Sequence, residues 1–158
     1  MSLCDSYRAT DTATIQNNNL AVQPFPEIIV TFANHNSKEM VGNFLLVGLG
    51  GAIGSMARYG ITILFNHLSY ASQWGTLTAN IIGSFLIGLL IVTTRDSAYL
   101  FGAVGVCGGF TTFSTFSSQA LELLQSGQRL QAALYIIVSV ISGLLATLFG
   151  IYLGNRLK

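Results

Sequence analysis

Four long apolar stretches follow one another after residue 40, and short polar segments separate them. Each stretch is close to the roughly 20 residues that an α-helix needs to cross the hydrocarbon core of a bilayer. Because the connecting segments are short, consecutive helices should run in opposite directions. We therefore predict an all-α membrane protein with spans at residues 44–65, 75–94, 99–124 and 130–153.

Residues 1–40 contain no comparable stretch and are rich in Asn, Thr, Ser and Gln. A segment of this composition cannot bury enough apolar surface to offset the entropy lost on ordering. We expect a polar, disordered extension at 1–40 and a four-span domain at 41–158. Two interpretations stay open for the extension. It is either a flexible cytoplasmic tail, or a dispensable addition to a chain whose native start is Met40.

Composition narrows the class of protein. Hydrophobic residues make up 51% of the chain and charged residues only 8%, with a mean hydropathy of +0.61, whereas soluble domains carry about 25% charged residues. The spans leave no room for a soluble catalytic domain, so we do not expect an enzyme. A net charge of +1 with scattered basic residues lacks the basic patch that nucleic-acid binding requires.

The third apolar stretch contains the most unusual segment of the chain, residues 108–118. Two adjacent glycines, Gly108 and Gly109, are followed by six hydroxyl side chains. Each glycine weakens a helix by about 1 kcal/mol relative to alanine, so we predict a helix broken at its centre. Carbonyls released at such a break can coordinate a cation inside an assembly. The alternative is a harmless kink whose hydroxyls bond to their own helix.

Two further polar residues lie within the apolar stretches. Asn80 is near the middle of the second stretch, where an unpaired amide is costly and therefore normally lines a cavity or bonds across helices. Arg58 is the only cation within a stretch, and an intramembrane charge indicates a functional site. Its position near the end of the first stretch also fits a side chain that snorkels to the interface.

Hydroxyls and aromatic rings suggest an anion path. Tyr135, Ser139, Gly143 and Thr147 recur every four residues and share one helix face. Three phenylalanines of the third stretch recur every three residues, and the positive edge of an aromatic ring can replace part of an anion's hydration. They are Phe110, Phe113 and Phe116. No Asp or Glu lies deep in any stretch, which suits an anion better than a proton or a cation.

Small residues recur four apart in several stretches, and such faces allow helix backbones to approach closely in lipid. These positions are Gly50 and Gly54, Ser84 and Gly88, Ser139, Gly143 and Thr147, and Ala146, Gly150 and Gly154. Their number favours oligomerisation, although packing within one chain would use the same faces. Basic residues outside the stretches show a weak bias between the two sides, which permits insertion in both orientations.

These residues together resemble the Fluc/CrcB family of bacterial fluoride channels over residues 42–154. The motifs that carry the resemblance are Gly50-Gly51-Ala52-Ile53-Gly54 with Arg58-Tyr59, Gly75-Thr76-Leu77 with Asn80 and Gly83-Ser84-Phe85, and Gly108-Gly109-Phe110-Thr111-Thr112-Phe113-Ser114-Thr115-Phe116-Ser117. The resemblance implies an antiparallel, dual-topology homodimer in the inner membrane that exports fluoride passively and so reduces its toxicity. It also implies a sodium ion at the dimer centre, held by the carbonyls of Gly108 and Thr111.

The resemblance implies a fluoride pathway as well. It would include Asn80, Phe113, Phe116, Tyr135, Ser139 and Thr147, to which we add the hydroxyls of Thr112 and Ser114, with Arg58 in an electropositive vestibule. Two positions depart from the family pattern. Gln119 stands where many relatives carry glutamate, and Gly143 stands where some carry serine.

Two other functions remain as alternatives. A small multidrug-type proton-coupled transporter also has four short spans, but it needs a membrane-embedded carboxylate, and none is present. A non-conducting scaffold subunit would explain the small-residue faces, but it would gain nothing from costly polar groups such as Asn80.

Overall fold

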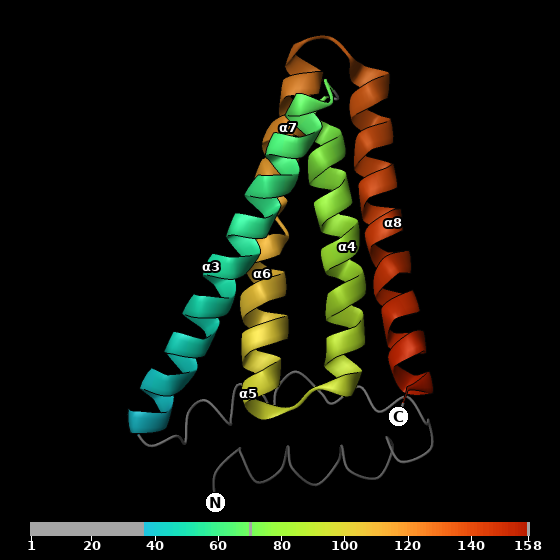
Figure 1. Ribbon diagram of the computed structural model, residues 1–158. Helices are drawn as coiled ribbons and strands as arrows, with labels where there is room; N and C mark the ends of the chain where they lie inside the picture. The colour runs from blue at the N-terminus through green and yellow to red at the C-terminus, as the bar shows by residue number, and fades with distance from the viewer. Residues whose placement is uncertain (1–36, 70, 158) are drawn as a thin grey trace, which may run out of the picture. The chain divides into compact units, whose positions relative to one another are not determined.

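The structure, a computed structural model, describes residues 37–69 and 71–157 (Figure 1). All regular structure in these two ranges is helical. The expected N-terminal extension lies, up to residue 36, outside the described residues, so its disorder stays a prediction.

Four helical segments are long and apolar enough to cross a membrane, which confirms the four predicted spans. The first is α3 (Ser37–His67), the second is α4 (Ser72–Thr93) and the fourth is α8 (Arg129–Arg156). At 1.5 Å per residue, the 22 residues of α4 extend about 33 Å, close to the thickness of a bilayer core. α3 begins at Ser37, earlier than the predicted residue 44. The apolar pattern could not indicate these first turns, because they contain polar residues.

The third segment is composite. It contains α5 (Asp96–Tyr99), a π-helical stretch η1 (Leu100–Cys107), α6 (Gly108–Phe110) and α7 (Phe113–Gln125). Between α6 and α7, Thr111 has φ −83° and ψ 155°, and Thr112 has φ −149° and ψ 112°. Both values are extended rather than helical. We call these two residues the extended pair. Gly108 and Gly109 themselves are helical, so the extended backbone lies just after the glycines.

The helices pack as two pairs. α4 lies along α8, and α3 lies against η1 and α6 (Figure 1). Glycines make both contacts close. A Cβ on Gly150 would meet the backbone of Phe85 and Leu89, and a Cβ on Gly109 would meet the carbonyl of Gly51. These small residues therefore serve packing within one chain, which weakens their value as evidence for oligomerisation.

A tight turn joins α7 to α8. The N–H of Gln128 donates to the carbonyl of Leu123 over 2.9 Å, and the N–H of Gly127 donates to Leu124 over 3.2 Å. Gly127 has φ +80°, the left-handed conformation that closes a helix C-terminus and favours glycine. This turn sets α8 antiparallel to α7.

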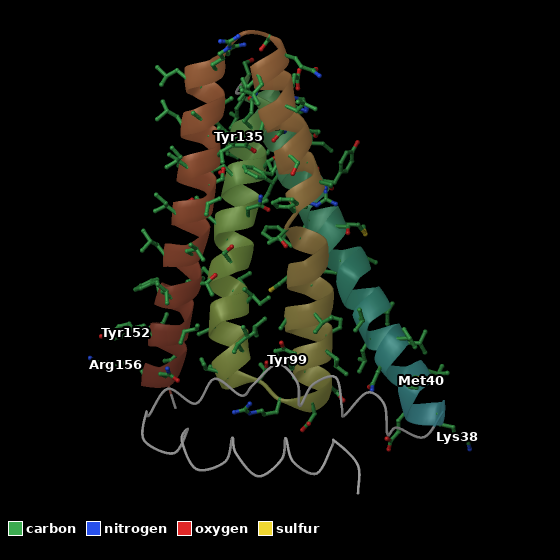
Figure 2. The ribbon with its side chains drawn as sticks, turned by 180° about the vertical axis from the view of Figure 1, so that it is seen from behind. Lys38, Met40, Tyr99, Tyr135, Tyr152 and Arg156 are labelled. Atoms are coloured by element: carbon green, nitrogen blue, oxygen red, sulfur yellow. The ribbon has the colours of Figure 1, made fainter. Side chains whose placement is uncertain are left out.

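Large apolar side chains cover much of the outer surface, as expected for a chain solvated by lipid. Figure 2 shows Lys38, Tyr99, Tyr152 and Arg156 toward one end of the helices. At that end, Arg156 Nη2 donates to the Tyr152 hydroxyl over 3.0 Å and the guanidinium lies 5.3 Å from the ring centroid. Such polar tips mark the interface between lipid and water.

Candidate functional site

Asn80 binds the extended pair through both ends of its amide. The Thr112 N–H donates to Asn80 Oδ1 over 2.8 Å, and Asn80 Nδ2 donates to the Thr112 carbonyl over 3.3 Å. A side-chain amide thus replaces the backbone partners that a continuous helix would supply. Because the NH2 group carries two hydrogens, one donor of Asn80 is left for another acceptor.

Four carbonyls, those of residues 108–111, lose their helical donors next to the extended pair. In a continuous helix the Thr112 N–H would donate to Gly108 and the Thr115 N–H to Thr111. The Thr112 N–H donates to Asn80 instead, and the Thr115 N–H donates to the side chain of Thr112 over 3.3 Å, as at a helix N-cap. The carbonyls of Gly108 and Thr111 are therefore among the acceptors that this backbone conformation releases.

Residues of α3 bind a third carbonyl of the same segment. Ser55 Oγ and Arg58 Nε donate to the Gly109 carbonyl over 3.4 and 3.2 Å. In a continuous helix this carbonyl would accept from Phe113, but Phe113 is the first residue of α7. Arg58 is half-buried, so its guanidinium is tied to the third span rather than extended freely into a vestibule.

The hydroxyls of the motif divide into two groups. Thr111 Oγ1 donates to Cys107 over 2.9 Å and Ser117 Oγ donates to Phe113 over 2.9 Å, both within their own segment. Thr112 Oγ1 instead lies 3.2 Å from Ser114 Oγ and donates to Thr115 Oγ1 over 3.1 Å. Only this second group forms a side-chain cluster at the start of α7.

Three aromatic rings lie in sequence from α7 to α8. The ring centroids of Phe113 and Phe116 are 5.6 Å apart, and those of Phe116 and Tyr135 are 5.3 Å apart. Phe113 is 79% exposed, whereas Phe116 is 9% exposed. Phe110 does not join this line. It is 8% exposed and lies against α4, where its Cδ1 would be 3.2 Å from a Cβ on Gly83.

Gln119 holds Tyr135 in place. Its Oε1 accepts from the Tyr135 hydroxyl over 2.9 Å, and its Nε2 donates to Ser72 Oγ over 3.2 Å. Gln119 is only 7% exposed, so a buried amide connects α4, α7 and α8. At this departure from glutamate, the amide is therefore bonded at both its oxygen and its nitrogen. Figure 2 shows Tyr135 toward the end of α8 that is opposite Arg156.

The face of α8 that carries Tyr135 also carries Ser139, Gly143 and Thr147, and we call these four residues the α8 stripe. The members beyond Tyr135 differ in their hydrogen bonding. Thr147 Oγ1 donates to the Gly143 carbonyl of its own helix over 3.1 Å. Ser139 Oγ is buried and has no hydrogen-bond partner among the described residues. A buried hydroxyl without a partner is costly, and Ser139 is thus the stripe residue best suited to receive a ligand.

The structure brings the predicted residues together in two places. Asn80, Thr112 and Ser114 meet at the extended pair, and Phe113, Phe116 and Tyr135 form the ring line. Within the described residues, no side-chain hydrogen bond joins Ser139 or Thr147 to either group.

Sequence reasoning missed Ser55 and Ser72 and recognised Gln119 only as a departure. Ser55 could have been found, since it lies on the same helix face as Arg58, three residues away. No comparable signal points to Ser72. Among the described residues, no group of three or more His, Cys, Asp or Glu could hold a metal ion.

Comparison with known proteins gives a consistent result. Residues 45–151 match the family described as CrcB-like protein, Camphor Resistance (CrcB). A protein of Hyphomonas neptunium is 42% identical over 125 residues, which are 74% of this chain and 98% of the relative. Proteins of Thermus thermophilus and Leptospira interrogans are 46% and 44% identical, covering 74% and 70% of this chain and 97% and 93% of the relatives. All three are named fluoride-specific ion channel FluC.

Proposed function

Since this chain belongs to the CrcB-like family, we propose that it is a channel that conducts fluoride passively across a bacterial membrane. The observation that carries the proposal is a site of uncharged polar groups and aromatic rings at the extended pair, formed by Asn80, Thr112, Ser114 and the ring line. Of the acidic residues in the described helices, Glu39 and Asp96 begin a segment and Glu122 lies near the end of α7. The site therefore suits an anion.

We propose that the extended pair is a functional break in the third span and that a second copy of the chain covers it. Lipid tolerates non-helical backbone only where protein or a water-filled cavity adjoins it. Gly108 and Phe113 are exposed in the single chain, and a Cβ on Gly108 would meet nothing within 4 Å. An antiparallel, dual-topology homodimer would bury this region and is consistent with the weak charge bias.

We propose that sodium binds two of the released carbonyls. The carbonyls of Gly108 and Thr111 lack their helical donors, and carbonyl oxygens at unwound helices are suitable ligands for this ion. When bound, sodium would compensate their partial charges and link the two copies. The residues around them act independently of the ion, because Asn80 and the Thr112 hydroxyl keep the backbone extended.

The proposed fluoride pathway uses the donors that the structure leaves available. These are the second Nδ2 hydrogen of Asn80, the hydroxyl of Ser139, and the edges of Phe113 and Phe116. The Thr112 hydroxyl donates to Thr115, so Ser114 donates to Thr112 and would have to exchange that bond to contact fluoride. Tyr135 and Thr147 donate to protein acceptors, so each would have to exchange that bond to contact fluoride. The positive charge of Arg58 would attract anions to the same region.

Ion efflux from liposomes tests the function. The protein is reconstituted into liposomes loaded with potassium fluoride or potassium chloride, with sodium present on both sides, and release is followed with ion-selective electrodes after valinomycin is added. A fluoride channel releases fluoride but not chloride, and only when valinomycin carries the balancing potassium. A proton-coupled transporter would instead respond to an imposed pH gradient, and a scaffold would release neither ion. Either result would refute the proposal.

Sodium replacement tests the cation separately. We expect fluoride flux to fall strongly when sodium is replaced on both sides by N-methylglucamine, because two carbonyls of each copy would lose the ion that they coordinate. Restoring sodium should restore flux. Unchanged flux after thorough dialysis would show that the extended pair needs no cation, while the fluoride channel itself would stand.

A further inference from the structure

We infer that Ser55 and Arg58 are positioning residues that hold the Gly109 carbonyl and thereby orient the extended pair for conduction. This inference rests on the proposed function for its meaning, but the geometry stands by itself. Two donors from successive turns of α3 converge on one oxygen, at 3.4 Å from Ser55 Oγ and 3.2 Å from Arg58 Nε.

The face of α3 that carries these donors is also the face that packs on α6. Gly51, Gly54, Ser55 and Arg58 follow the spacing i, i+3, i+4 and i+7 of a single helical face. The carbonyl of Gly51 occupies the space that a Cβ on Gly109 would need, and a Cβ on Gly54 would meet the backbone of α6 and η1. The glycines bring the backbones together, and Ser55 and Arg58 then bond across the contact.

The extended pair is consequently held from two sides. α4 holds Thr112 through Asn80, and α3 holds Gly109 through Ser55 and Arg58. Only Phe110 and Thr111 lie between these two attachment points. With both ends fixed, the carbonyl of Thr111 keeps one orientation, and the helical backbone of α6 fixes that of Gly108, the residue before the Gly109 attachment. The Gly109 carbonyl is already bonded to a cationic group and is not offered to a second cation.

The chemistry of arginine explains why Arg58 can do more here than supply a positive charge. The guanidinium is planar, and its Nε–H direction is fixed by the side chain, whereas the lysine ammonium is a flexible point charge. Arg58→Lys therefore keeps the electrostatic attraction for anions and removes the directed donor. If Arg58 acted only as a positive charge that attracts anions, Arg58→Lys would conduct fluoride like the parent.

We would compare the parent with Arg58→Lys, Ser55→Ala and, as matched control, Arg156→Lys, whose arginine bonds to Tyr152 at the end of α8. Two quantities are measured: the sodium concentration that gives half-maximal fluoride flux in liposomes, and the hydrogen exchange of peptides covering residues 108–116 in detergent. The second quantity requires no transport, so it is informative even if the channel proposal fails.

We expect Arg58→Lys to raise the half-maximal sodium concentration and the exchange rate of this segment by about tenfold or more, the effect of losing one hydrogen bond to a charged group. Ser55→Ala should change both in the same direction by less, and Arg156→Lys should change neither. Ser55→Ala keeps the test decisive if Arg58→Lys does not assemble.

Exchange and sodium dependence that match the parent in Arg58→Lys and Ser55→Ala would overturn the inference. A parent without fluoride flux would refute the proposed function, and the exchange data would still decide whether the two residues hold the segment.

Discussion

The side chain of Asn80 shows how one residue can stabilise a non-helical backbone inside a membrane. Its amide supplies an acceptor and a donor to the N–H and carbonyl of Thr112, 32 residues away in the sequence. Sequence reasoning selected Asn80 because a polar group in an apolar stretch is costly. The two options open for it were a cavity lining and a bond across helices, and the structure shows the bond across helices, with one amide hydrogen left for another acceptor.

Replacing Asn80 should destabilise the protein as well as impair flux. Asn80→Leu leaves two backbone groups of Thr112 without partners, and each such group costs about 1–3 kcal/mol. We expect a lower thermal unfolding midpoint in detergent, followed by size exclusion, together with loss of fluoride flux. Thr93→Val is the control, because the Thr93 hydroxyl is exposed and bonds to its own helix. A Leu variant as stable as the parent would contradict the assigned role.

The three phenylalanines should respond differently to replacement by isoleucine. Phe113 is exposed and Phe116 lies between two rings, so Phe113→Ile and Phe116→Ile should keep the fold, at a packing cost under about 3 kcal/mol. Flux should nevertheless fall steeply, since the ring edges are lost.

Phe110→Ile supplies the comparison for this series. Phe110 packs against α4 outside the ring line, so its replacement should affect stability more than flux. Assembly and flux are measured on the same preparations. Parental flux in both the Phe113 and Phe116 variants would show that these rings only pack.

At the scale of helices, backbone contact through glycine determines which elements pair. α4 and α8 approach closely at Gly88 and Gly150, and α3 approaches α6 at Gly109. The apolar pattern predicted the four spans because burial in lipid depends on local composition alone. It could not show that the glycine faces would be used within the chain, since either partner would fit the same spacing.

Adding a methyl group at Gly150 should separate α4 from α8. The Cβ would meet backbone atoms of Phe85 and Leu89, which cannot move as a side chain can, so we expect Gly150→Ala to cost about 1–3 kcal/mol. Gly60→Ala is the control. A Cβ there meets nothing within 4 Å, and alanine favours a helix by about 1 kcal/mol. Thermal unfolding in detergent measures both, and equal midpoints would contradict this packing.

At the scale of the whole molecule, the residues that the proposed function requires all lie after the first turns of α3. The family match spans residues 45–151, and every residue assigned to the site lies between Ser55 and Thr147. We therefore expect a chain that starts at Met40 to conduct fluoride like the full chain. Flux per inserted protein is measured in liposomes. Loss of flux with normal insertion would show that residues 1–39 contribute to the channel.

The sequence by itself determined the membrane environment, the four spans and the kinds of polar group that the spans contain. These properties depend on composition and on spacing within one helix, so they can be predicted without the fold. Only the tertiary structure decided which partner each polar group takes. The contacts of Arg58 with Gly109 and of Gln119 with Ser72 join residues 51 and 47 positions apart. Local spacing carries no information about such pairs, because they form only when separate helices pack together.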